Sequence, residues 1–423
     1  MKEDFLQYVW QAALYKQEAL ATFDGKQVVV INPGTLNTDA GPDFFNAKLM
    51  VDNTLWAGNV EVHLTSSEWM QHGHQFDQAY NNVVLHVVYE HDQEIVNQLG
   101  KVIPTVELRS IIPHSVISKY NHLHLGNKWI ACENLLPELN FQEVSPFIHQ
   151  LFLERLNDKT RFILKDLKLN DYNWEITFYE YLARNFGFKT NSLPFHILAK
   201  SIPIQLLAKL KSNLFQLEAL LFGQAGFLED HFIDEYPMAL KKEYHYLRKA
   251  YQLDPINSTL WKFATMRPAN FPTLRIAQFA KLVHSSTSLF SKCMEIKSIR
   301  QLNALFNIDL HDYWQNHYQF DQITAYKDKK LGKASIENIF MNTIAPFMFA
   351  YGKDRSVASL CERSVELMIN IPAENNGIIR RWEQLGFKVE TAFHSQAFIQ
   401  LKNMYCTPKK CLSCHIGNQL LKK

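Results

Sequence analysis

The sequence predicts an α+β protein with a small mixed sheet near the N-terminus, a large and mostly α-helical region, and a cysteine-rich segment at the C-terminus. Three observations predict this division. β-Branched segments are confined to about residues 27–108, apolar residues recur at helical spacing from about residue 145, and three of the six cysteines lie within nine residues near the end. We therefore divide the chain into residues 1–130, 131–400 and 401–423.

Composition indicates a globular protein without a strong charge bias. The 423 residues are enough for more than one core, and 47% hydrophobic with 20% charged residues is ordinary for a globular chain. The net charge of +2 means that any nucleic-acid-binding surface has to be local. The cysteines do not resemble a disulfide framework, and no signal peptide or long apolar run occurs. We expect a cytoplasmic protein with no membrane partner.

The N-terminal elements follow from periodicity. Apolar residues at helical spacing predict a helix within residues 1–15, and β-branched runs predict strands over 27–31, 43–51, 56–65, 83–88 and, more weakly, 104–108. The turn Asp52-Asn53 joins the second and third of these strands, which makes them a hairpin. Residues 65–82 read as a loop followed by a short helix. This order predicts a modest α/β core.

The middle of the chain is predicted to be helical throughout. Gly187 and Gly223 are interpreted as helix stops. The predicted helical segments are residues 147–167, 174–186, 193–221, 274–283, 336–350 and 378–385.

Two short motifs on the predicted hairpin carry the main functional hypothesis. Gly41-Pro42-Asp43-Phe44 opens one strand, and Glu61-Val62-His63 lies on the next. Because strand side chains alternate with period two, Glu61 and His63 share a face, and the hairpin brings Asp43 near Glu61. Two carboxylates suit Mg²⁺ or Mn²⁺, which would lower the pKa of a bound water and stabilise charge on a phosphoryl group. The predicted catalytic residues are Asp43, Glu61 and His63, with Asp43 and Glu61 as metal ligands.

Polar residues beyond the motif are possible neighbours of this site. His72, His74 and Asp77 have a spacing that a metal can use, although loop histidines more often bond to backbone or water. His86 interrupts an apolar strand, where a buried neutral histidine is the commoner interpretation and a role in the site is the alternative.

The order of elements and the spacing of these motifs resemble the PD-(D/E)XK nuclease superfamily over about residues 1–110. The resemblance implies that Asp43 and Glu61 bind the metal together with the backbone carbonyl of Val62, and that Glu3 or Glu18 on the first helix assists. His63 stands where that superfamily normally has lysine. A histidine there can act as a base, serve as a third ligand that favours a transition metal, or mark a decayed site.

The C-terminal cysteines form the second motif. Cys411-x-x-Cys414 allows two thiolates to bind one metal from a tight turn, with Cys406 as a third ligand and either His415 or Cys132 as a fourth. Zinc is our first expectation. An iron–sulfur cluster competes, because some nucleases that resemble this superfamily hold one with one upstream and three C-terminal cysteines.

Within the helical region, Arg267-Pro268-x-Asn270-Phe271-Pro272-x-x-Arg275 predicts a rigid loop leading into a helix. Arg267 and Arg275 are candidate phosphate contacts, and structural salt bridges are the commoner alternative use of such arginines.

Taken whole, the sequence resembles an uncharacterised bacterial family, the domain of unknown function 2851, which carries no established activity. The shared features are the motifs around Asp43, Glu61, His86 and Arg267 and the C-terminal cysteine motif. Our hypothesis is a metal-dependent nuclease acting on DNA or RNA. The alternatives are a non-catalytic nucleic-acid-binding or protein-binding scaffold that keeps a nuclease-like fold, and a histidine-site metal hydrolase of another substrate.

Overall fold

A computed structural model describes residues 1–125, 128–139, 141–264, 266–286 and 288–422. The chain forms two compact units. Met1–Phe147 together with Leu401–Lys423 makes the first unit, and Ile148–Gln400 makes the second. The C-terminal segment therefore belongs to the same unit as the N-terminal sheet, although 253 residues of the second unit separate them in sequence.

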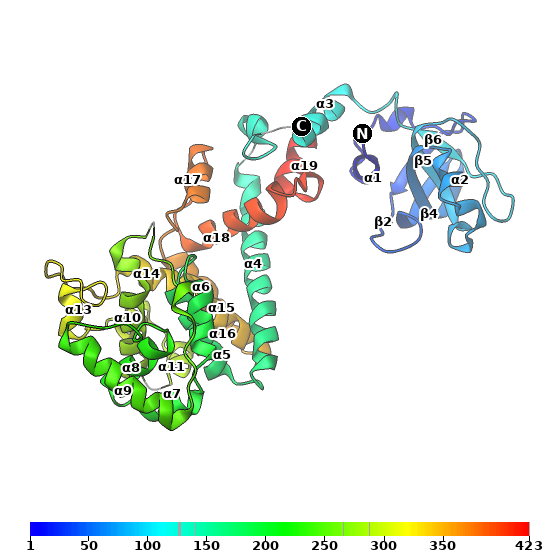
Figure 1. Ribbon diagram of the computed structural model, residues 1–423. Coiled ribbons are helices and arrows are strands. Elements are labelled where there is room, and N and C mark those ends of the chain that lie inside the picture. Colours follow the sequence, from blue (N-terminus) through cyan, green and yellow to red (C-terminus); the bar gives the residue numbers. More distant parts are fainter. Residues whose placement is uncertain (126–127, 140, 265, 287, 423) are drawn as a thin grey trace. The chain divides into compact units, whose positions relative to one another are not determined.

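The first unit is built on a six-stranded mixed sheet (Figure 1). Its main path runs β1-β3-β4-β5-β6, with the short β2 paired to β3. β3 is antiparallel to β1 and β4, whereas β4, β5 and β6 run parallel. The predicted mixed sheet is confirmed. The strands are β1 (Val28–Asn32), β2 (Thr35–Leu36), β3 (Phe44–Val51), β4 (Thr54–Thr65), β5 (Val83–Glu90) and β6 (Thr105–Glu107).

Helix α1 (Glu3–Gln11) packs on the sheet through its apolar stripe. Phe5 and Val9 are fully buried in the same cluster as Val60 and Val62 of β4. Because strand side chains alternate, Val60 and Val62 face this core while Glu61 and His63 project from the opposite face. Burying each of these large apolar side chains contributes roughly 1.5–3 kcal/mol.

The opposite face of the sheet is covered by the segment between β4 and β5. The predicted single helix is replaced by three short turns, α2 (Glu68–Gln71), η2 (His74–Phe76) and η3 (Gln78–Tyr80). Trp69 and Tyr80 from this segment form a second small core with Val83. Gly73 adopts a left-handed conformation with φ of +78°, and this lets the chain reverse between α2 and η2.

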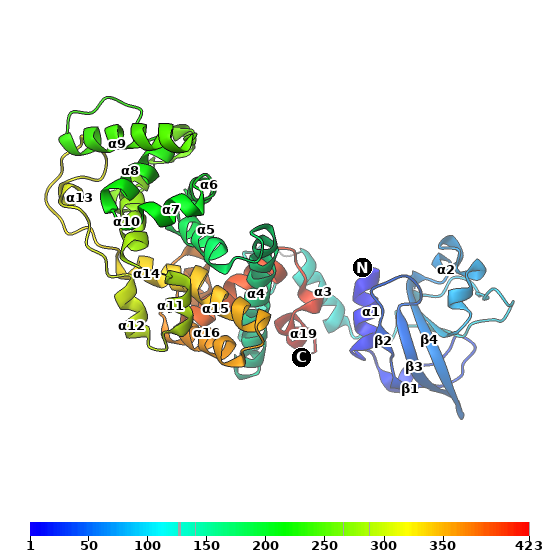
Figure 2. The same ribbon diagram turned by 90° about the horizontal axis from the view of Figure 1, so that it is seen from below.

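The remaining elements of the first unit come from both ends of its sequence. They are η1 (Gln17–Ala19), α3 (His114–Leu125), η4 (Glu133–Glu138), the π-helical turn η8 (Leu401–Cys406), η9 (Cys411–Ser413) and α19 (His415–Lys422). α19 packs beside α3, as Figures 1 and 2 show. Leu421 of α19 is buried in the same cluster as Phe5 of α1.

The second unit is all helical in the part that the structure describes, apart from isolated bridges. α4 (Phe141–Leu169) runs into it from the first unit, and α5 (Trp174–Phe186) has the predicted bounds. The predicted helix over residues 193–221 is wrong in its continuity, because Pro203 and Asn213 each start a new helix. The three pieces are α6 (Ser192–Lys200), α7 (Ile204–Leu210) and α8 (Leu214–Gln224).

The two glycines interpreted as helix stops behave differently. Gly187 is the C-cap of α5, as expected. Gly223 lies inside the last turn of α8, and a Cβ there would come within 2.0 Å of the Tyr244 ring. The structure thus uses the missing side chain of Gly223 for close packing against α9 (Glu235–Tyr251).

The rest of the second unit follows the helical periodicity of the sequence. Every helix in the described ranges is too short or too polar to cross a lipid bilayer. The remaining helices are α10 (Pro272–Ser285), α11 (Leu289–Glu295), α12 (Ile299–Leu305), α13 (Asp312–Asn316), α14 (Lys333–Ile339), the π-helical η7 (Phe340–Ile344), α15 (Ala345–Asp354), α16 (Ala358–Asn370), α17 (Gly377–Gln384) and α18 (Ala392–Gln400). Two short 3₁₀ turns in the described part of this unit are η5 (Ser258–Leu260) and η6 (Pro268–Asn270).

Candidate metal centre

The two carboxylates of the hairpin motif are held by each other's strands. Asp43 immediately precedes β3, and its Oδ2 accepts a hydrogen bond of 3.0 Å from the backbone N–H of Val62 in β4. In return, Oε2 of Glu61 accepts a bond of 3.0 Å from the backbone N–H of Asp43. The antiparallel register of β3 and β4 therefore sets where both carboxylates lie.

Nε2 of His63 is the atom on which the neighbouring groups converge. It lies 3.5 Å from Oε1 of Glu61 and 3.2 Å from Nδ1 of His72. On the other side of the ring, Nδ1 of His63 lies 2.9 Å from Nε2 of His86, which projects from the parallel strand β5. His86 thus fixes the ring orientation of His63 and leaves the Nε2 atom directed at Glu61 and His72.

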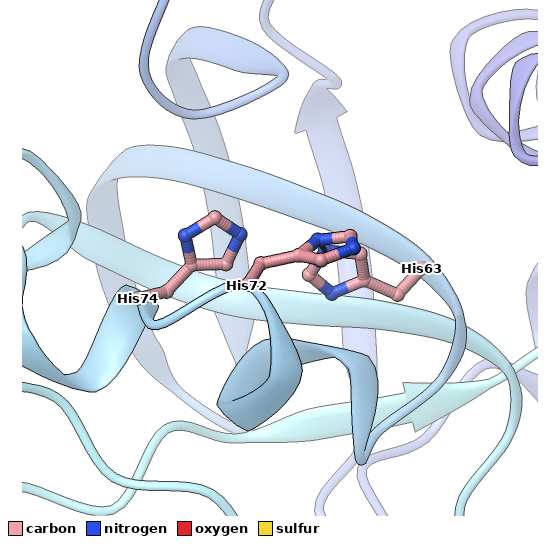
Figure 3. Close-up of side chains that lie close together, drawn as sticks. All are labelled: His63, His72 and His74. Carbon is pink, nitrogen blue, oxygen red and sulfur yellow. Dashed lines mark hydrogen bonds between the residues drawn. The ribbon is translucent and has the colours of Figure 1, made fainter.

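Two further imidazoles come from the segment after α2 and complete the cluster (Figure 3). The ligand nitrogens of His63, His72 and His74 all lie within 4.8 Å of one another. Nε2 of His74 lies 3.3 Å from Oε1 of Glu61 but makes no hydrogen bond. The His74 ring stacks on Tyr80 at a centroid distance of 3.8 Å, which holds it in place.

The members of the cluster differ in their burial. Glu61 is 4% exposed and His63 is 1% exposed, whereas Asp43 is half-buried and His72 is exposed. His72 is therefore the member of the cluster that is exposed to solvent.

Burial shapes the electrostatics of the centre. Desolvation, followed by repulsion from Glu61, raises the pKa of Asp43 to about 7. Desolvation raises the pKa of Glu61 to about 8, and it lowers the pKa of His63 to about 3 with help from the neighbouring His74 and His72. A divalent cation among these groups would relieve the repulsion between the two carboxylates and could bind the Nε2 atom of the His63 imidazole.

The donor set fits a divalent transition metal. Imidazole nitrogen suits zinc, iron, copper and nickel, while Mg²⁺ prefers oxygen and keeps much of its water. Three imidazoles and the Glu61 carboxylate surround one spot, and the buried Nε2 of His74 is left without a hydrogen bond. Glu61, His63, His72 and His74 would hold the ion, with Asp43 and His86 beside them.

Asp77 takes a different role from the one considered for it. It is exposed, and its Oδ1 accepts a hydrogen bond from the backbone N–H of Ala79, which caps η3. Asp77 is close to His74 in sequence, but its carboxylate caps η3 and does not belong to the histidine cluster.

The structure also adds α1 to the centre. Nε2 of Gln7 donates to Oδ1 of Asp43 at 2.9 Å and to Oε1 of Glu3 at 3.2 Å. Glu3, one of the two helix carboxylates implied by the nuclease resemblance, thereby lies close enough to interact with Asp43. Sequence reasoning missed Gln7, although its position one helical turn after Glu3 is a signal that places both on one face.

The four candidate cysteine ligands all lie in the first unit. Cys414 is buried, and Cys132, Cys406 and Cys411 are half-buried. Burial, followed by the neighbouring Cys414 and Cys411 thiols, raises the pKa of Cys132 to about 12. His415, the alternative fourth ligand, is exposed and lies against Phe147 and Gln419.

The two candidate phosphate contacts have different surroundings in the second unit. Arg267 is exposed at the start of η6. Arg275 is buried in α10, where its guanidinium donates to Asn270, Gln278 and Ser335 and lies 4.5 Å from the Phe188 ring centroid. Arg275 thus stabilises the helical packing.

The chain matches the family described as "Protein of unknown function (DUF2851)" over residues 3–377. The match covers both the sheet and most of the helical unit, so the chain belongs to this family. Comparison with curated proteins and with solved structures gives no match.

Proposed function

We propose that this protein is a metal-dependent hydrolase of nucleic-acid phosphodiesters, with its centre at Glu61, His63, His72 and His74. The observation that carries the proposal is the convergence of Glu61 Oε1 and the His72 imidazole on Nε2 of His63. Asp43 and Glu61 are held to adjacent backbones, so a cation enters a site that is already organised.

The proposed hydrolysis requires a bound metal ion and a side chain that accepts a proton. A bound divalent ion supplies a water of lowered pKa and stabilises charge on a phosphoryl group. The protein's own groups position that ion, and the half-buried Asp43 is placed to accept a proton from an attacking water. His86 keeps the His63 ring in one orientation throughout.

A basic cavity beside α1 supports an anionic substrate. The cavity of about 460 Å³ includes Gln7, whose amide contacts Asp43, and the basic side chains of Lys2, Lys409 and Lys410 outnumber the one carboxylate among its described residues, that of Asp4. Lysines near a phosphodiester-cleaving centre can bind the phosphates on either side of the scissile bond.

The test is cleavage of labelled single- and double-stranded DNA and RNA with Mg²⁺, Mn²⁺ or Zn²⁺ added to chelator-treated protein. We expect metal-dependent cleavage that falls by ~100-fold or more in Glu61→Gln, because even outer-shell partners of a metal are worth ~10–100-fold. Asp39→Asn is the matched control, since Asp39 is an exposed acid four residues before Asp43. Cleavage at the wild-type rate by a folded Asp43→Asn/Glu61→Gln double variant would exclude this centre.

A second candidate function is favoured by the imidazole triad itself. Three nitrogens within 4.8 Å suit a tightly bound transition metal better than the exchangeable Mg²⁺ of many nucleases. A protein purified with one such metal per chain, which loses it in His72→Ala/His74→Ala and cleaves no nucleic acid, would be a hydrolase of another substrate class.

A further inference from the structure

The second unit contains a cavity of about 390 Å³ that takes no part in the proposed hydrolysis. Its wall is formed by side chains of α4, α5, the α5–α6 connection, the first residue of α6, the π-helical turn η7 and α15. α5 packs against both α6 and η7, so the wall is part of one helical core. The volume lies within the range of roughly 300–1,000 Å³ that is typical of small-molecule sites.

Lys159 of α4 lies on the wall of this cavity and is held by uncharged groups. Its Nζ donates to Oδ1 of Asn342 at 3.0 Å and to the carbonyl of Met341 at 3.4 Å, and both of these residues lie in η7. The same Nζ donates to Oε1 of Gln396 at 3.0 Å. Single π-helical turns are frequent at functional sites, and here the turn supplies two acceptors for a lysine on the cavity wall.

The charge of Lys159 is not balanced by a carboxylate in contact with it, since its three hydrogen-bond partners in the described part of the chain are all neutral. Arg155, one turn earlier on α4, donates to the same Oε1 of Gln396 at 2.6 Å, and the Gln396 amide donates to Glu374 at 2.6 Å. Two cations therefore share one amide oxygen. Desolvation, followed by repulsion from Arg155, lowers the pKa of Lys159 below its ordinary value. An anion in the cavity would offset both effects.

Arg184 of α5 adds a second cation to the wall. Its side chain is exposed, and its Nε donates to Oγ of Ser192 at 3.3 Å. Because a guanidinium has five N–H donors, further donors remain for a ligand. Among the described residues that line the cavity, Asp166 is the one carboxylate, and its Oδ2 already accepts a hydrogen bond of 2.7 Å from the Tyr181 hydroxyl. The wall therefore carries an excess of positive charge.

Aromatic rings lie on the same wall. Phe162 of α4 is 66% exposed and Phe188 is half-buried, and both line the cavity. Exposed rings beside two cations suit a ligand that joins an anionic group to a flat apolar ring, because the ring gains apolar contacts while the cations fix the charged end.

We propose that this cavity binds a small ring-bearing anion, an aromatic carboxylate or a nucleoside monophosphate, with its charged group at Lys159 and Arg184. The bond from Lys159 to the Met341 carbonyl is the longest of its three, so an anionic oxygen would take over this donor. The site is separate from the histidine cluster, because all of its residues belong to the second unit.

Isothermal titration calorimetry of the full chain tests the proposal with four probes, which are AMP, indole-3-acetate, inorganic phosphate and adenosine. We expect AMP or indole-3-acetate to bind, and the tighter of the two identifies the anionic group. Phosphate lacks the ring and adenosine lacks the charge, so each should bind at least ~10-fold more weakly. Absence of binding by both ring-bearing anions would overturn the proposal, and so would equally tight binding of adenosine or of phosphate.

A variant and a mapping experiment locate the binding. Arg184→Gln changes an exposed side chain and should raise the Kd of the bound anion by ~10-fold or more, since it removes charged hydrogen-bond donors. Arg161→Gln is the matched control, because Arg161 is exposed on the same helix as Lys159 but does not line the cavity. Hydrogen exchange with the ligand bound should slow in α5 and η7 and stay unchanged in the first unit. An unchanged Kd in Arg184→Gln, or protection confined to the first unit, would contradict this site.

Discussion

His63 lies at the position where the sheet and the segment after α2 meet. Its two ring nitrogens have different tasks, because Nδ1 contacts His86 while Nε2 faces Glu61 and His72. A lysine here would present one mobile ammonium group, whereas this imidazole is held in a plane by a neighbour. A histidine at this position therefore suits a metal ligand better than a lysine would.

The buried carboxylates make the metal-free protein sensitive to pH. Asp43 and Glu61 keep their protons up to a pKa of about 7 and about 8 in the folded state, against 3.8 and 4.5 for the ordinary groups. Between these values the folded state binds more protons than the unfolded state, so stability falls as pH rises. His63, with its pKa lowered to about 3 from 6.5, opposes this trend only below about pH 6.5.

We therefore expect the free energy of unfolding of chelator-treated protein to decrease from about pH 6.5 to about pH 8. Denaturant titrations across this range measure the slope, and the Asp43→Asn/Glu61→Gln variant should flatten it. A slope that is the same in the variant and the wild type would show that other groups titrate.

At the scale of single elements, the hairpin of β3 and β4 does most to build the candidate site. Its antiparallel register places Asp43 beside Glu61, and its parallel neighbour β5 places His86 behind His63. A one-residue slip of β4 would send Glu61 and His63 into the apolar core and Val62 into the site. The burial of Val60 and Val62 thus holds Glu61 and His63 of the candidate site in place.

Element packing in the second unit depends on Gly223, and this gives a further prediction. Gly223→Ala would push a methyl group into the buried Tyr244 ring, which a Cβ would approach to 2.0 Å. We expect a loss of about 1–3 kcal/mol in the free energy of unfolding, as for other overpacked cores.

Calorimetry of Gly223→Ala should show the loss, and Gly377→Ala is the matched control. Gly377 is the first residue of α17, and nothing lies within 4 Å of a Cβ built there. Equal melting behaviour of the two variants would mean that α8 and α9 separate easily.

At the scale of the whole molecule, the chain leaves the first unit, builds the second and then returns. Leu421 near the C-terminus completes the core that Phe5 begins near the N-terminus. The first unit therefore depends on contacts between residues that lie more than 400 positions apart.

We expect Leu421→Ala to destabilise the first unit by about 2–5 kcal/mol, because this side chain is 1% exposed in the core. Hydrogen exchange should show lower protection across α1 and the sheet and little change in the second unit. Leu193→Ala is the control, since Leu193 is 64% exposed. Uniform loss of protection in both units would indicate that they unfold as one.

The sequence by itself determined the N-terminal strands and the apolar face of β4, and it placed the helical region, although not every helix boundary in it. The alternation around Glu61 and His63 and the bounds of α5 could be read directly, because local periodicity reports which side of an element is apolar. Only the tertiary structure decided that Gln7 and His86 lie beside the candidate site and that Cys132 belongs to the same unit as the C-terminal cysteines. These arrangements join segments that are distant in sequence. They depend on how the strands pair and where the chain returns, and no local pattern encodes either.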